Sequence, residues 1–252
     1  MFSNDLFSPR AVVRPGLWAV IQEDGLINNV VPGIEKCRVS IVASPKMGAG
    51  FVEYIVTTEE GGYTSRPFAG EEGIESFLYV LKGKLKVTVE GTAKLLSETD
   101  YVFAPAGKGI LFSAEEEPCK FLLYKQRFVP FEDKKPWTVW GTGKDLIYRE
   151  LAGLSNVHMT DLLPTDIAFD MNFHILEFEP GARHPFVETH VQEHGAYITS
   201  GQGMYYMDDR WMGIKEGDFM WFGPYVPQGA YGVGTEKFSY VYSKDCNRDV
   251  TL

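Results

Sequence analysis

The sequence contains little cysteine, no long apolar run and little positive charge, and each shortage narrows the class of protein. Only three of its 252 residues are cysteine. Cys37, Cys119 and Cys246 are far apart and show no CxxC spacing, which favours a reducing compartment and thiols that are simply part of the fold. No segment approaches the ~18 apolar residues that a membrane helix needs, and the first residues do not match a signal peptide. We therefore expect a soluble, cytoplasmic protein.

Basic residues are outnumbered and dispersed along the chain. There are 24 lysines and arginines against 34 aspartates and glutamates, so the net charge is −10. Because no basic cluster stands out, nucleic acid and anionic membranes are poor partners. We expect a small-molecule substrate instead.

Helical periodicity is also scarce, and short strand patterns take its place. Runs of alternating β-branched and aromatic residues, such as 51–58 and 172–181, recur between Gly, Pro or Asp residues. Such spacing is typical of an all-β sandwich or barrel. The segments 141–154 and 160–170 are the best candidates for short helical or irregular connectors.

The chain contains an internal repeat. Segment 76–91 resembles segment 194–209, and 99–107 resembles 217–225. Three matched pairs share one offset of 118 residues, namely Tyr79 with Tyr197, Gly83 with Gly201 and Asp100 with Asp218. We therefore predict two β-barrels, one formed by residues 1–140 and one by residues 141–252.

All five histidines lie in the second half of the chain, at or after residue 158. The offset shows what replaces the metal-ligand candidates in the first half. Glu188 corresponds to Gly70, His190 to Glu72, His194 to Ser76 and Gln228 to Ile110. A set of ligand-type residues that one of two related barrels lacks indicates a function, and here a metal site in the second barrel.

The segment "HVQEH" (190–194) admits two interpretations. It matches H-x-x-E-H, the helical zinc signature of a metallopeptidase group in which Glu193 would act as the base. Gly195, Pro185 and the strand-like sequence that follows favour strands instead. On a strand, Glu188 and His190 face the same way, and His194 enters from the next strand.

The other polar residues of this region are expected to lie outside the site. We expect Gln192 and Glu193 to be solvated, His184 to be a loop histidine, and His158 and His174 to be incidental. Of Tyr240 and Tyr242, we expect only one to face the interior.

These residues resemble the cupin superfamily, whose first motif is G-x5-H-x-H-x3/4-E-x6-G and whose second ends in a metal-binding histidine. Gly181, Glu188, His190, His194 and Gly201 keep that skeleton but change the order of the ligands, and Gln228 takes the final histidine position. This Glu/His/His/Gln set, together with the end "FSYVYSKDCNRDV", is similar to the (S)-ureidoglycine aminohydrolase family. The resemblance covers nearly the whole chain and implies an all-β bicupin, two tandem jelly-roll β-barrels with short helical connectors.

The resemblance also implies a reaction, in which water replaces the Cα amine of (S)-ureidoglycine to give (S)-ureidoglycolate and ammonia in purine degradation. It implies Mn²⁺ held by Glu188, His190, His194 and Gln228. Oxygen donors favour Mn²⁺ or Fe²⁺, and Ni²⁺ and Zn²⁺ stay open. Glu188 is our candidate proton carrier.

Beyond the ligands, the resemblance places three residues around the substrate. Lys244 is the candidate anchor for the substrate carboxylate, and Tyr240 and Tyr205 are candidates for the pocket wall.

Two alternatives remain open from the sequence. The chain could be another Mn²⁺- or Fe²⁺-dependent bicupin enzyme, such as an isomerase or dioxygenase, or a small-molecule-binding cupin without catalysis. Cupins often associate through strand edges, which otherwise need protection, so we expect a homo-oligomer.

Overall fold

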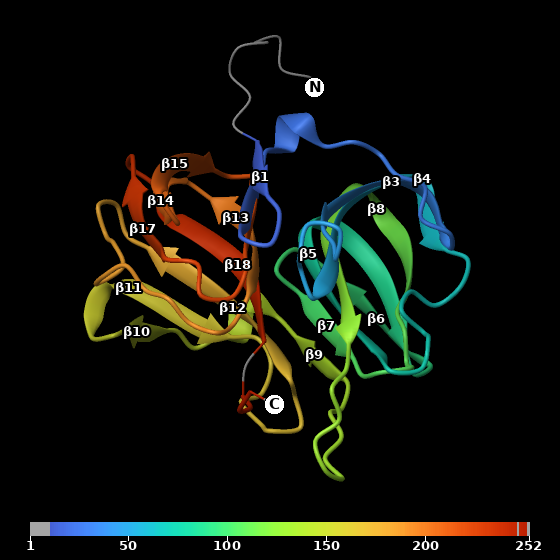
Figure 1. Cartoon of the computed structure of the whole chain (residues 1–252). Helices are drawn as coiled ribbons and strands as arrows, with labels where there is room; N and C mark the ends of the chain where they lie inside the picture. The colour runs from blue at the N-terminus through green and yellow to red at the C-terminus, as the bar shows by residue number, and fades with distance from the viewer. Residues whose placement is uncertain (1–10, 246, 251–252) are drawn as a thin grey trace.

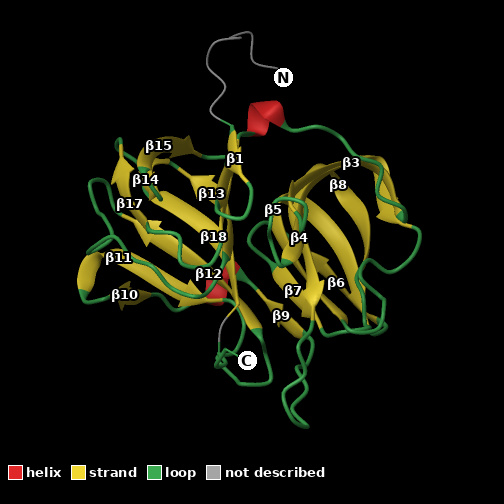
Figure 2. Ribbon diagram, in the orientation of Figure 1, coloured by secondary structure: helices red, strands yellow, loops and turns green. Residues whose placement is uncertain are grey.

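The computed structural model describes residues 11–245 and 247–250, and nearly all of its regular structure is β. Figures 1 and 2 show two β-barrels side by side. The expected all-β architecture of two tandem barrels is confirmed. Among the described residues, no helix is long and apolar enough to cross a membrane.

The first barrel is a seven-stranded antiparallel sheet in the order β3-β4-β8-β5-β7-β9, with β6 paired to β5. Its strands are β3 (Ile34–Ala43), β4 (Phe51–Thr64), β5 (Ile74–Val89), β6 (Thr92–Leu96), β7 (Tyr101–Ala104), β8 (Leu111–Arg127) and β9 (Val139–Gly141). Its interior is a cluster of aliphatic and aromatic side chains that includes Val56, Leu78 and Phe121.

The second barrel is built from two sheets. The eight-stranded sheet has the order β1-β2-β16-β13-β18-β12-β11-β10, and the three-stranded sheet has the order β15-β14-β17. The strands are β1 (Val12–Arg14), β2 (Trp18–Ile21), β10 (Arg149–Leu151), β11 (Leu154–Asp161), β12 (Met171–Phe178), β13 (His194–Ser200), β14 (Gln202–Met207), β15 (Arg210–Lys215), β16 (Phe219–Phe222), β17 (Gln228–Val233) and β18 (Phe238–Asp245).

The strand bounds repeat at the offset found in the sequence. Adding 118 to the ends of β7, 101 and 104, gives 219 and 222, the ends of β16. The ends of β8, 111 and 127, give 229 and 245, within one residue of the span 228–245 that β17 and β18 occupy together. The two barrels therefore share one strand plan.

The barrels also exchange a strand. β2 lies before the first barrel in the chain but pairs with β16 of the second. In return, β9 lies just before the second barrel but pairs with β7 of the first. A short 3-10 helix follows each exchanged strand, η1 (Glu23–Gly25) and η2 (Gly143–Asp145). We retain as a proposal the division near residue 140, with this exchange added to it.

The two segments that we expected to be short helical or irregular connectors, 141–154 and 160–170, are so only in part. Segment 141–154 contains η2 and β10, and segment 160–170 begins in β11 and continues as turns.

An apolar layer joins the two barrels. Phe77 of β5 stacks on Phe173 of β12 with ring centroids 3.9 Å apart, and both side chains are fully buried. Trp221 and Val241 of the second barrel belong to the same cluster of buried side chains. Burial of these side chains between the barrels thus fixes the relative position of the two barrels.

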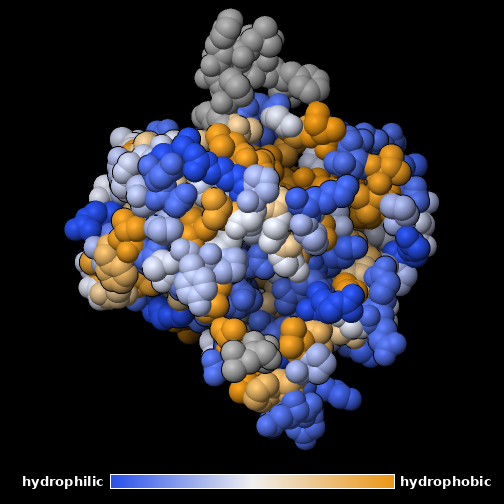
Figure 3. Space-filling view, in the orientation of Figure 1, coloured by the Kyte–Doolittle hydropathy of each residue, from blue (hydrophilic) through white to orange (hydrophobic). Residues whose placement is uncertain are grey.

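The outer face of the molecule differs from this layer. In Figure 3, hydrophilic residues dominate the visible face and apolar ones appear in separate groups.

Candidate metal centre

Two histidines and a glutamine converge inside the second barrel. Nε2 of His190 lies 2.9 Å from Nε2 of His194, and the side-chain amide of Gln228 lies 3.0 Å from Nε2 of His190. His194 begins β13 and Gln228 begins β17. Glu188 pairs with Gln228 through two backbone hydrogen bonds, of 2.8 and 2.9 Å, so both side chains lie on one face.

The segment that carries these residues is not helical. Residues 190–193 lie outside any regular element, and β13 starts at His194. The helical peptidase interpretation of "HVQEH" is therefore wrong, because the backbone does not bring the two imidazoles together by helical spacing.

The backbone fixes which nitrogen of each histidine faces the centre. Nδ1 of His190 lies 3.0 Å from the carbonyl oxygen of Gln192, and Nδ1 of His194 lies 3.4 Å from that of Ser243. A carbonyl oxygen only accepts, so each Nδ1 carries the hydrogen and each Nε2 presents a lone pair. Burial lowers the pKa of both histidines, which favours the neutral form.

Two lone pairs at 2.9 Å repel each other unless a positive group lies between them. Two ligand atoms about 2.1 Å from one ion and at right angles lie about 3.0 Å apart. The separation of the two Nε2 atoms therefore fits a shared divalent cation, and hydrogen bonds from Nδ1 to carbonyl oxygens are typical of metal-binding histidines.

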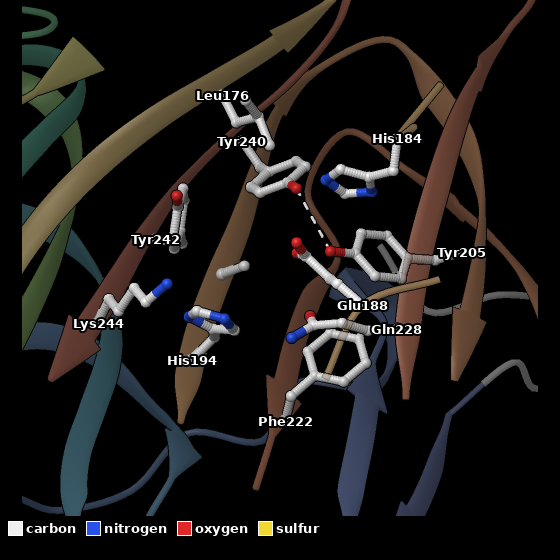
Figure 4. A pocket seen from close by; sticks show the side chains of 11 residues that line it. Leu176, His184, Glu188, His194, Tyr205, Phe222, Gln228, Tyr240, Tyr242 and Lys244 are labelled. Carbon is white, nitrogen blue, oxygen red and sulfur yellow. Dashed lines mark hydrogen bonds between the residues drawn. The ribbon is translucent and has the colours of Figure 1, made fainter. Parts of the chain in front are cut away.

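The side-chain oxygens of Glu188 and Gln228 do not point toward the position between the Nε2 atoms of His190 and His194. Among the described residues, no three His, Cys, Asp or Glu side chains are arranged so that they could hold a metal ion as they stand. In Figure 4 the carboxylate of Glu188 points toward the hydroxyl of Tyr205. A change of side-chain torsions in Glu188, and a half-turn of the Gln228 amide to present oxygen, would complete the predicted set.

A small pocket adjoins these ligands, with a cavity volume of about 40 Å³. That volume holds about three water molecules. It is lined by Leu176, His184, Glu188, His194, Ala196, Tyr205, Phe222, Gln228, Tyr240, Tyr242 and Lys244. The structure thus brings the predicted residues Lys244, Tyr240 and Tyr205 to the same pocket as the ligands.

The charges in the pocket act on one another. Burial raises the pKa of Glu188, and the positive charge of Lys244 partly offsets that increase. Lys244 stands opposite His194 in the pairing of β18 with β13. Tyr205 and Tyr240 bring their hydroxyls to 3.3 Å, and burial raises the pKa of both.

The expectation that only one of Tyr240 and Tyr242 faces the interior is wrong. Both line the pocket, because residues two apart on a strand point to the same face. His184 does lie in a loop segment, but the expectation that it lies outside the site is wrong, since its side chain is 5% exposed and lines the pocket. Its Nδ1 accepts a hydrogen bond from the backbone N–H of Ala230 at 2.8 Å, and burial lowers its pKa to about 4.

Glu193 is not a solvated residue either. Its carboxylate accepts hydrogen bonds from the backbone N–H of Gly50, at 2.9 and 3.1 Å, and from Nε1 of Trp221 at 3.0 Å. Gly50 belongs to the first barrel, so Glu193 connects the two barrels immediately beside His194. Burial raises the pKa of Glu193, and the Trp221 hydrogen bond opposes that change.

His174 is buried in a polar chain rather than incidental. Its Nδ1 lies 2.7 Å from Oδ1 of Asp161. The two carboxylate oxygens of Asp161 also accept one hydrogen bond each from Arg149, at 2.6 Å to Oδ2 and 3.1 Å to Oδ1. His174 stands opposite Tyr242 in the pairing of β12 with β18. The sequence signal was a histidine in the apolar strand pattern "MNFHILEF", which predicts a buried and therefore paired side chain.

Two tandem jelly-roll barrels define a bicupin. Its second barrel gathers two His side chains and one Gln side chain beside a small pocket and so contains a candidate metal site. A family model of the cupin domain matches residues 174–243. The chain is 47% identical to the (S)-ureidoglycine aminohydrolase of Escherichia coli over 253 aligned residues, which cover 100% of this chain and 97% of that protein. It belongs to the (S)-ureidoglycine aminohydrolase family.

Solved structures agree with this assignment. The crystal structure of the E. coli protein Ylba is similar with a TM-score of 0.89 and 44% identity, and the match covers 100% of both chains. Oxalate decarboxylase of Bacillus subtilis, a protein with Mn(II) centres, matches at a TM-score of 0.65 and 13% identity over 95% of this chain and 79% of that one. The second similarity concerns the fold alone.

Proposed function

We propose that this chain is a metal-dependent (S)-ureidoglycine aminohydrolase. Water replaces the amine on Cα of (S)-ureidoglycine, and the products are (S)-ureidoglycolate and ammonia. The observation that carries the proposal is the convergence of His190 and His194 Nε2 atoms, 2.9 Å apart, beside a pocket that also contains Lys244. Membership of the family supplies the substrate.

Glu188, His190, His194 and Gln228 would hold the ion, which we propose to be Mn²⁺. Two imidazole nitrogens, a carboxylate and an amide oxygen form a hard donor set that suits Mn²⁺ or Fe²⁺. A bound divalent ion would supply Lewis-acid stabilisation of the reacting groups.

The chain's own residues orient the substrate and move the proton. Lys244 lines the pocket as a half-buried ammonium group, so it attracts the substrate carboxylate there. Glu188 is the carboxylate that lines the pocket and is therefore the candidate general base. Glu188 takes a proton from the attacking water and returns one to the departing amine, so ammonia leaves and the hydroxyl group stays on Cα.

The pocket wall restricts the direction of attack. The cavity volume is about 40 Å³, and the lining includes three tyrosines and Phe222. A narrow pocket with such a wall limits the access of bulk water to the reacting carbon. Delivery of water to one face of Cα preserves the handedness of the product.

The test is ammonia release from freshly generated ureidoglycine by Mn²⁺-loaded protein. Wild type should release ammonia far faster than the unaided decay of the substrate, and His190→Ala should reduce the rate to that background. His158→Ala is the matched control, because His158 lies on β11 outside the pocket. Equal rates for wild type and His190→Ala would refute the proposal.

We also propose a cytoplasmic homo-oligomer. Exposed strand edges such as β10 and β15, at the ends of their sheets, offer surfaces for association. Light scattering coupled to size-exclusion chromatography measures the mass of the assembly, and a mass of 28.4 kDa would refute the oligomer.

A further inference from the structure

We propose that His184 is a specificity-determining residue that donates a hydrogen bond from Nε2 to the ureido carbonyl oxygen of the substrate. This inference deepens the proposed function and rests on it. His184 was not among the residues that the sequence assigned to the site, and its role follows from three structural observations.

The first observation is that the backbone fixes the tautomer of His184. Residues 182–184 run beside β17, and His184 exchanges two hydrogen bonds with Ala230. Its N–H donates to the Ala230 carbonyl at 2.8 Å, and its Nδ1 accepts from the Ala230 N–H at 2.8 Å. An Nδ1 that accepts has no hydrogen, so the neutral ring carries its hydrogen on Nε2.

The second observation is that this Nε2–H group has no acceptor among the residues that the structure describes. His184 is 5% exposed and lines the pocket. Within residues 11–245 and 247–250, Nδ1 is the only nitrogen of this ring that makes a hydrogen bond. Phe178 and Tyr205 hold the ring edge-on, with centroids 5.1 and 6.2 Å away. Because His184 lines the pocket, its Nε2–H group can donate to water there or to a ligand that displaces the water.

The third observation is the chemistry of the pocket around His184. In Figure 4, His184 lies at one end with the hydroxyls of Tyr205 and Tyr240, and Lys244 lies toward the other. The hydroxyls are 3.3 Å apart, and with the neutral imidazole they form a polar but uncharged end. This end lacks a cationic side chain of its own, so the substrate carboxylate is better placed at Lys244.

These observations orient the substrate. Its carboxylate is the group that pairs with Lys244, which leaves the ureido group for the uncharged end. A ureido group is neutral and has one strong acceptor, its carbonyl oxygen, together with N–H donors. The Nε2–H of His184 matches the acceptor, and the hydroxyl oxygens of the Tyr205–Tyr240 pair match the donors.

The variant His184→Asn separates this role from a structural one. The Asn side-chain oxygen takes the place of Nδ1 and still accepts from the Ala230 N–H, but nothing replaces the Nε2–H donor. In His184→Gln the amide reaches the position of Nε2 and restores a donor toward the pocket.

The experiment measures the binding of two ligands to Mn²⁺-loaded protein by calorimetry. (S)-Ureidoglycolate carries the ureido group, and glycolate carries only the carboxylate and the hydroxyl. His184→Asn should weaken ureidoglycolate about tenfold, the effect of one lost hydrogen bond. Glycolate should bind both proteins equally, and His184→Gln should recover part of the lost affinity.

Four outcomes would overturn the inference. If His184→Asn weakens both ligands equally, His184 does not recognise the ureido group. If the variant loses affinity for Mn²⁺ itself, His184 acts through Glu188 or through the fold. If wild type and His184→Asn show the same difference in affinity between ureidoglycolate and glycolate, and wild type releases ammonia normally, the proposed function stands and the inference alone fails. If wild type releases no ammonia and binds the two ligands equally, the proposed function and the inference about His184 both fail.

Discussion

Glu53 of β4 is a carboxylic acid buried where the two barrels meet, and its replacement by methionine is expected to stabilise the protein. Glu53 is 0% exposed, and both of its carboxylate oxygens lack a hydrogen-bond partner among the described residues. It points at Gly195, where an added Cβ would lie 2.6 Å from its Oε2. A buried polar group without a partner costs about 1–3 kcal/mol. Methionine has a similar length and no such cost.

The pH dependence of the stability follows from the same burial. Burial raises the pKa of Glu53 well above 4.5. Above pH 4.5 the folded chain keeps a proton that the unfolded chain releases, so stability falls as pH rises toward the pKa of the folded state. The slope is at most about 1.4 kcal/mol per pH unit for one proton. Glu53→Met should remove this contribution and gain most at alkaline pH.

The assay is denaturant unfolding of wild type and variant at pH 6 and pH 9. Glu59→Met is the matched control, because Glu59 lies on the same strand but is exposed. We expect Glu53→Met to raise the free energy of unfolding at both pH values, and at pH 9 by more than the about 1–3 kcal/mol of the unpartnered group alone. A loss of stability at pH 9, or an unchanged difference between the two pH values, would refute the reasoning.

Three further substitutions test the surroundings of the site. Gly195→Ala places a Cβ 2.6 Å from Glu53 Oε2 and 2.7 Å from a ring carbon of Phe51, so it should lower the free energy of unfolding by about 1–3 kcal/mol; a variant as stable as wild type would contradict this packing. Glu193→Ala leaves the N–H groups of Gly50 and Trp221 without their acceptor and should cost about 1–3 kcal/mol in denaturant unfolding; Glu193→Gln, which keeps an acceptor, should cost less. Lys244→Met should lower kcat/KM for ureidoglycine about tenfold to a hundredfold while Mn²⁺ stays bound, and steady-state kinetics with wild-type values would exclude Lys244 as the carboxylate anchor.

Local patterns were sufficient for much of the architecture. Alternation predicted the strands, and the offset of 118 placed β16 from β7 without error at either end. The offset also singled out the four ligand candidates, because Gly70, Glu72, Ser76 and Ile110 cannot replace them. In the structure Glu72 is exposed and Ile110 is fully buried, so the corresponding corner of the first barrel offers no cluster of donors.

Long-range pairing explains what local patterns missed. The exchange of β2 and β9 between the barrels depends on pairs that are far apart in the chain. Ala19 and Trp221 are 202 residues apart, and Phe103 and Val139 are 36 apart. No periodicity within a strand encodes such a choice of partner.

The misassigned polar residues have the same cause. Glu193 has its partner Gly50 in the other barrel, 143 residues away. His184 lies in a loop-like sequence before Pro185, but its pairing with Ala230 buries it. Tyr240 and Tyr242 were a different error, since a period of two already places both on one face.

The central claim is that one divalent ion binds in the second barrel. Anomalous diffraction at the manganese absorption edge, from crystals grown with Mn²⁺, tests it most directly. We predict one peak per chain, within ligand distance of His190 and His194 Nε2, with Gln228 and Glu188 turned toward it. A peak in the first barrel, or none near the two imidazoles, would contradict the account.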